Sequence, residues 1–191
     1  MKKLVFLLIM VLSAGYTAYS QEDGTVDPKL KRKLTKEEKA IIKEAEERAM
    51  AQMVDSLIKE RRFVLEAEYL SNQYGNRIVV NSLINFIIVD SNNIVIQIAS
   101  TTGVGGYNGL GGITTRGRIT SYEITKTGKA RNNYAIRLMA STVIGTFDIF
   151  FNISPNSNTN ATISGNSPGR LNYYGSIKPI EVSKVFKATA I

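Results

Sequence analysis

The hydrophobic residues that follow residue 34 recur at helical spacing for several turns. The segment Thr35-Lys36-Glu37-Glu38 has the form of a capping box, in which the Thr35 hydroxyl accepts a hydrogen bond from the Glu38 amide. The pattern predicts an amphipathic helix over residues 35–61. We expect its apolar face to pack on the domain that follows, with a projecting spacer helix as the alternative. That face consists of Ile42, Ala45, Ala49, Met53 and Leu57, with Met50 and Val54 at its margin.

After residue 62 the hydrophobic period changes from helical to two. Phe63, Leu65 and Ala67 fall on one side of the chain, whereas Glu66 and Glu68 fall on the other. Such alternation is typical of a half-buried strand whose charged side faces solvent.

Further β-patterned segments follow at close spacing, and short turn clusters separate them. Because turns rather than helical crossovers join the segments, we expect antiparallel pairing. The sequence therefore predicts a mainly β domain over residues 62–191, an antiparallel sandwich or closed barrel of about eight or nine strands. The segments are 77–81, 83–90, 94–100, 118–125, 134–142, 147–154, 160–165, 170–177 and 182–187.

Residues 103–112 contain six glycines between two β-patterned segments. A phosphate-binding loop would require a Lys followed by Ser or Thr, or the start of a helix, after the last glycine. The chain instead continues with the strand-like Ile113-Thr114-Thr115, and Asn108-Gly109 favours a tight hairpin turn. We therefore predict a hairpin tip or a twisted sheet edge here.

Residues 1–20 have the parts of a secretory signal peptide: Lys2 and Lys3, a short apolar run, and the small residues Ala18 and Ser20 before a charged segment. The apolar run is shorter than the roughly 20 residues of a spanning helix. The chain has no cysteine for a lipoprotein anchor or a disulfide. We expect cleavage after Ser20, a flexible linker over residues 21–34, no transmembrane span in the mature chain, and a periplasmic or secreted protein.

The chain lacks the residue types that carry most catalysis. It contains no histidine and no cysteine, so we expect no metal ion and no cofactor. A glycan hydrolase would need two carboxylates roughly 5 to 10 Å apart. Glu66 and Glu68, about 7 Å apart along one strand face, are the pair that the sequence itself places. Asp90-Ser91-Asn92-Asn93 is too short for a calcium loop and predicts a turn.

The positive charge lies mainly in the β domain. The formal net charge is +8, and residues 63–191 hold 11 basic and 6 acidic residues. Arg116 and Arg118 are two residues apart and therefore share one strand face. A candidate ligand-binding surface combines these arginines with aromatic and amide side chains, and an anionic glycan, a lipid head group or an envelope protein would suit it. Because we expect export, we do not expect nucleic acid as the partner. The candidate residues are Tyr107, Asn108, Arg116, Arg118, Tyr173 and Tyr174.

The order of these segments resembles a known family. The strand Phe63-Val64-Leu65-Glu66-Ala67 follows a helix, Gly111-Gly112-Ile113 follows a hydrophobic strand, and Ile163-Ser164-Gly165 precedes Leu171-Asn172-Tyr173-Tyr174-Gly175. This arrangement resembles domain-of-unknown-function family 4251, a group of secreted bacterial proteins, over about residues 36–190. The resemblance implies an exported β-rich domain and brings no catalytic residues.

Together these observations favour a non-catalytic ligand-binding or protein-interaction module of the bacterial cell envelope. A carboxylate-dependent glycan hydrolase and a structural component of an envelope assembly are the alternatives.

Overall fold

The computed structural model describes residues 36–99, 112–128, 133–165 and 169–187. Residues 41–191 form one compact unit, which contains most of the helix and all the described strands. The elements are α2 (Lys36–Glu60), β1 (Arg62–Asn72), β2 (Arg77–Val79), β3 (Phe86–Asp90), β4 (Asn93–Ile98), β5 (Ile113–Thr127), β6 (Asn133–Thr142), β7 (Gly145–Ile153), β8 (Asn158–Ser164) and β9 (Arg170–Lys178).

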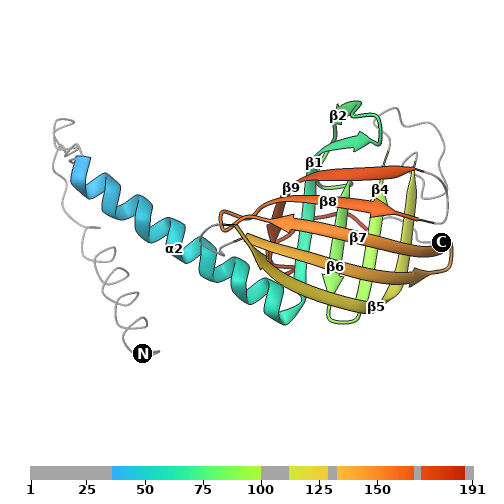
Figure 1. Ribbon diagram of the computed structural model, residues 1–191. Helices are drawn as coiled ribbons and strands as arrows, with labels where there is room; N and C mark the ends of the chain where they lie inside the picture. The colour runs from blue at the N-terminus through green and yellow to red at the C-terminus, as the bar shows by residue number, and fades with distance from the viewer. Residues whose placement is uncertain (1–35, 100–111, 129–132, 166–168, 188–191) are drawn as a thin grey trace, which may run out of the picture. The chain divides into compact units, whose positions relative to one another are not determined.

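The strands form a closed barrel (Figure 1). Every neighbouring pair is antiparallel, in the order β2-β1-β3-β4-β5-β6-β7-β8-β9, and β9 also pairs with β1. Eight strands therefore close on themselves, and β2 is an extra strand that pairs with β1 only opposite Tyr69, Leu70 and Ser71. The predicted antiparallel β fold is confirmed. The sequence left a sandwich and a closed barrel as alternatives, and the structure is a closed barrel. An eight-stranded barrel leaves an interior just wide enough for side chains or one small ligand.

The last turns of α2 contribute to the barrel core. Val54, Leu57 and Ile58 are buried together with side chains that point into the barrel, and the Tyr122 hydroxyl donates a hydrogen bond to the Ile58 carbonyl oxygen at 3.4 Å. The expected packing therefore holds for this half of the helix. Ile42, which we expected on the packed face, is 44% exposed, because only the C-terminal turns meet the strands.

Asp55 anchors the helix to the barrel. Its carboxylate accepts a hydrogen bond from the Tyr134 hydroxyl on β6, and the Lys59 ammonium lies 2.5 Å from it. The ammonium of Lys126, on β5, lies 3.7 Å away. The pKa of Asp55 is held below its usual value, first by the hydrogen bond from Lys59 and then by the one from Tyr134.

Replacement of Asp55 by asparagine should therefore destabilise the protein in a pH-dependent way. Because the folded-state pKa is lowered, the ionised carboxylate adds stability that is fully present above its unfolded pKa and is lost as pH falls through the folded pKa. We expect a loss of about 1 kcal/mol at neutral pH, since the side chain is partly exposed. In urea titrations the difference from wild type should shrink below about pH 4.

Glu44→Gln is the matched control for this prediction. The Glu44 carboxylate bonds Arg48 on an exposed helix face, at 2.6 Å, so its loss should change stability little. A difference between Asp55→Asn and wild type that stayed constant from neutral pH to pH 2 would contradict the anchoring role of the ionised carboxylate.

A second, smaller core lies on the outside of the barrel. Val64, Phe86 and Ile88 point outward from β1 and β3 yet are buried, and Ile180 and Val185 of the C-terminal segment pack against them. The Phe186 amide donates to the Leu83 carbonyl oxygen at 2.8 Å. The Gln97 side-chain amide donates to the Phe186 carbonyl oxygen, also at 2.8 Å. We expected a strand over residues 182–187, and this was wrong: the segment forms no strand and covers the outer face instead.

Candidate functional site

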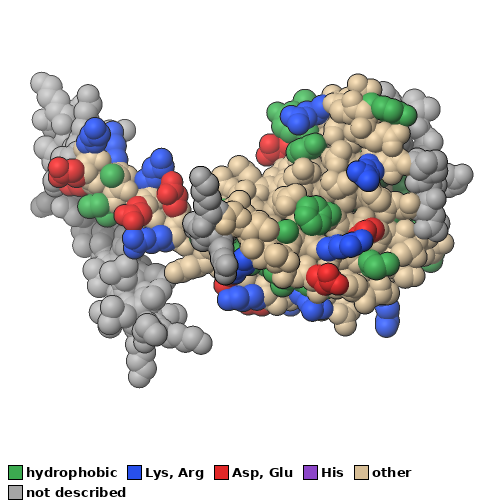
Figure 2. All heavy atoms as spheres, in the orientation of Figure 1, with side chains coloured by type: hydrophobic (Ala, Val, Ile, Leu, Met, Phe, Trp, Pro, Cys, Tyr) green, Lys and Arg blue, Asp and Glu red, His purple; other side chains and the backbone are tan. Residues whose placement is uncertain are grey.

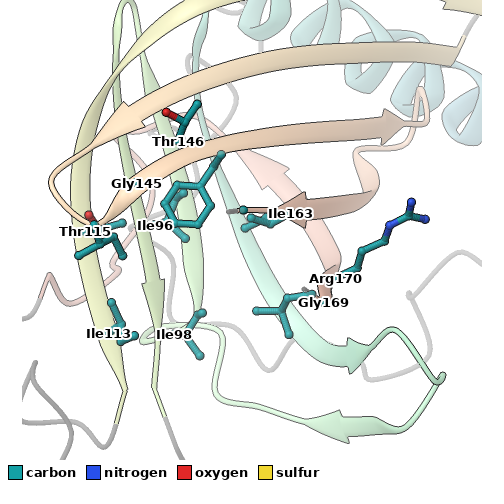
Figure 3. A pocket seen from close by; sticks show the side chains of 13 residues that line it. Ile96, Ile98, Ile113, Thr115, Gly145, Thr146, Ile163, Gly169 and Arg170 are labelled. Carbon is teal, nitrogen blue, oxygen red and sulfur yellow. The ribbon is translucent and has the colours of Figure 1, made fainter. Parts of the chain in front are cut away.

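A cavity lies at the distal end of the barrel, which we define as the end where β1 finishes, opposite α2. Its volume is about 400 Å³, within the usual range for small-molecule sites. The lining is mostly apolar and comes from β4, β5, β7, β8 and β9, through Ile96, Ile98, Ile113, Phe147, Ile163 and Leu171. Figure 3 shows the labelled isoleucines grouped around one space, while the Arg170 guanidinium extends away from them.

Strand alternation explains why these side chains converge. Ile96 and Ile98 face Thr115 and Ile113 across the β4–β5 pair, so alternate residues of both strands point inward. At the other end, the ring of Phe63 packs edge to face on that of Phe151 and fills the interior. At the distal end Phe147 is the one aromatic residue of the lining, and the aliphatic side chains around it leave the space unfilled.

Thr115 gives this apolar cavity a polar group. It lines the cavity, is 2% exposed, and its hydroxyl oxygen has no hydrogen-bond partner among the described residues. A buried hydroxyl without a partner costs about 1–3 kcal/mol. Rotation about the Cα–Cβ bond moves the hydroxyl to another staggered position, so a ligand with one hydrogen-bonding group could recover that free energy.

The structure does not gather the sequence-predicted binding residues at one place. Tyr107 and Asn108 lie outside the described residues. Arg116 and Arg118 pair with Val95 and Asn93 on the outer face of β5, where both are exposed. On the face of the barrel shown in Figure 2, basic and acidic side chains are interspersed rather than collected into one patch.

The two adjacent tyrosines of β9 point to opposite sides of the barrel wall. Tyr173 is fully buried, its hydroxyl donates to the Gln97 carbonyl oxygen at 3.2 Å, and burial raises its pKa. Tyr174 lies on the outer face, with the Arg77 guanidinium 4.6 Å from its ring centroid. Strand alternation in the sequence contained the signal for this separation.

The expected exposed pair of carboxylates is not formed. Glu66 is 5% exposed, and its carboxylate accepts hydrogen bonds from the Lys178 ammonium and the Ser183 hydroxyl, both at 2.7 Å. A β-bulge between Ala67 and Tyr69 also interrupts the register next to the exposed Glu68. The C-terminal segment supplies Ser183 and covers Glu66, so this part of the prediction was wrong.

Other candidate sites have ordinary structural explanations. Asp90 pairs with Asn93 at the tight β3–β4 turn, as predicted for that segment. Within the described ranges, acidic side chains form no group of three or more that could hold a metal ion. The described part of the chain has no helix that is apolar over a membrane-spanning length.

The fold and the cavity define the chain as a helix-capped, eight-stranded antiparallel barrel with an apolar distal cavity. The chain belongs to the family described as a domain of unknown function, DUF4251, whose family model matches residues 44–177. The resemblance seen in the sequence is thereby confirmed. A solved crystal structure of a DUF4251 family protein from Bacteroides eggerthii DSM 20697 is similar, with 26% identity and a TM-score of 0.62, covering 74% of this chain and 95% of that chain. A search of curated proteins found no match.

Proposed function

We propose that this chain is a non-catalytic binding domain that holds a small apolar ligand in the distal cavity of the barrel. The observation that carries the proposal is the apolar cavity of about 400 Å³, lined by side chains of five strands. Apolar pockets with a few placed polar groups are the usual form of small-molecule sites. The Thr115 hydroxyl is the polar group that a ligand would engage.

A binding role also suits the chemistry of the chain. There is no histidine or cysteine to act as base or nucleophile. Glu66, one of the two carboxylates that a hydrolase would need, is held by Lys178 and Ser183. We also propose that the protein is exported to the periplasm or the exterior, because residues 1–20 have the pattern of a signal peptide. Export would expose the domain to envelope or dietary small molecules.

Filling the cavity should abolish binding without unfolding the barrel. We expect Nile red, a neutral apolar dye, to bind the wild-type protein saturably with increased fluorescence. Ile98→Trp places an indole in the cavity and should weaken dye binding by at least about tenfold, which corresponds to 1.4 kcal/mol. Because the chain has no tryptophan, the emission of this indole also shows whether it is buried.

Met139→Trp is the matched control. Met139 lies on the outer face of β6 and is 42% exposed, so this variant should bind the dye as wild type does. Failure of the wild-type protein to bind Nile red, or equal binding by Ile98→Trp when its indole is buried, would overturn the proposed site.

A further inference from the structure

A groove on the outer face of the barrel crosses β7, β8, β9 and β1, separate from the distal cavity. Its volume is about 430 Å³, and its lining includes Glu68, Tyr69, Asn152, Asn158, Asn160 and Tyr174. None of these residues lines the distal cavity. The lining combines two aromatic rings, three amides and a carboxylate.

Strand register brings this set together. Asn152 pairs with Asn160, Asn160 with Tyr174, and Tyr174 with Tyr69. Tyr173 and Leu70, which adjoin the two tyrosines along β9 and β1, are buried in the barrel core. The row of paired residues therefore points outward, since successive side chains of a strand alternate between its faces. Four neighbouring strands of the barrel thus place an amide–amide–tyrosine–tyrosine row on one surface.

The extra strand β2 contributes to the same surface. It pairs with β1 opposite Tyr69 and carries Arg77. The Arg77 guanidinium lies 4.6 Å from the centroid of the Tyr174 ring and 5.7 Å from that of the Tyr69 ring. A cation over both rings restrains their orientation. The strand that is not needed to close the barrel therefore positions the aromatic part of the groove.

The amides give the groove donors and acceptors close to the rings. The side-chain oxygen of Asn160 is buried with no hydrogen-bond partner among the described residues. Rotation of this amide about Cβ–Cγ exchanges its oxygen and nitrogen, so either can be presented to a ligand. Asn152 and the carboxylate-bearing Glu68 are exposed beside it.

We propose that this outer groove is a saccharide-binding site, distinct from the apolar site in the distal cavity. A sugar ring offers C–H groups on its face, which pack on an aromatic ring, and hydroxyl groups at its edge, which both donate and accept hydrogen bonds. Tyr174 supplies the ring for the first contact, through the face that is not covered by Arg77. Asn152, Asn160 and Glu68 supply partners for the second. Because the one charged side chain among the lining residues is the carboxylate of Glu68, which would repel an anionic sugar, the groove suits a neutral saccharide.

The test is binding of the full chain to a microarray of neutral glucose, mannose, galactose and N-acetylglucosamine oligosaccharides. We expect wild type to bind at least one of these classes, and Tyr174→Ala to weaken that binding by about tenfold. Tyr74→Ala is the matched control, because Tyr74 is 80% exposed in the turn after β1 and does not line the groove. It should bind as wild type does.

Two further variants keep the test decisive. Asn152→Ala changes an exposed side chain, so it should fold normally even if Tyr174→Ala does not, and it should weaken binding severalfold. Ile98→Trp should bind saccharide unchanged, which separates this groove from the distal cavity. Absence of binding by wild type to every class on the array, or binding that is unchanged in both Tyr174→Ala and Asn152→Ala, would overturn the proposal.

Discussion

Replacement of Gly175 by alanine should disrupt the closure of the barrel. A Cβ at this position would lie 1.9 Å from the Glu66 carbonyl oxygen and 3.0 Å from the Ala67 Cα on β1. Both atoms belong to the backbone of the neighbouring strand, so no side-chain rotation can relieve the overlap. The β1–β9 pairing, in which Gly175 faces Ala67, must therefore shift.

The expected cost of Gly175→Ala exceeds the roughly 1–3 kcal/mol that is usual for an overpacked core. That is a large share of a typical domain stability of about 5–15 kcal/mol. Urea unfolding measures the loss, and hydrogen exchange should be fastest at the amides of β1 and β9. Ser176→Ala, one residue along the same strand, is the control and should change stability by under about 1 kcal/mol. Equal stabilities for the two variants would show that β1 and β9 do not approach this closely.

Replacement of Phe151 by alanine should be the most destabilising change in the core. Phe151 and Phe63 are fully buried, and their rings meet edge to face with centroids 5.6 Å apart and planes at 88°. Removal of the ring leaves a cavity that eight paired strands cannot readily collapse. We expect a loss of about 3–5 kcal/mol in the free energy of unfolding, which includes about 0.5–1.5 kcal/mol from the ring pair itself.

Phe150→Ala is a close control for this prediction. Phe150 is the preceding residue of β7, points outward and is 41% exposed, so its replacement should cost about 1 kcal/mol or less. Denaturant titrations of the two variants compare the inward and outward faces of one strand. Similar losses in both would contradict the assigned inward face of β7.

Local patterns in the sequence predicted most of the elements but not the closure of the barrel. Alternation of apolar residues predicted the strands, because every strand of a barrel has one buried face. The choice between barrel and sandwich depends on the pairing of β1 with β9, which lie far apart in the chain. Gly175 allows this pairing, yet a single glycine in a strand is an ambiguous signal.

The wrong predictions also have long-range causes. The apolar residues of 182–187 resemble a strand, but the segment pairs with no strand. Its Val185 packs instead on a part of the outer surface that is itself apolar, at Val64, Phe86 and Ile88. Strand alternation placed Glu66 in solvent. Its partners, Lys178 and Ser183, lie more than a hundred residues away in the chain. No local pattern identifies such partners.

The distal cavity could not be predicted from the sequence for a related reason. In the sequence, each of its apolar lining residues has the pattern of an ordinary core position of a strand. The space between these residues exists only in the assembled barrel, at its distal end. The outer groove is similar, since its row of asparagines and tyrosines depends on the register of four strands. The sequence did contain one usable signal for the groove. Successive residues of a strand point to opposite faces, so Tyr173 and Tyr174 had to lie on opposite sides of the barrel wall.

The most direct test of a ligand-holding distal cavity is a comparison of native and denaturing mass spectra of the exported protein, purified without detergent. We predict an additional small mass in the native spectrum that disappears on denaturation and is absent from Ile98→Trp. Identical native and denatured masses, in a wild-type protein that also takes up no Nile red, would contradict the account.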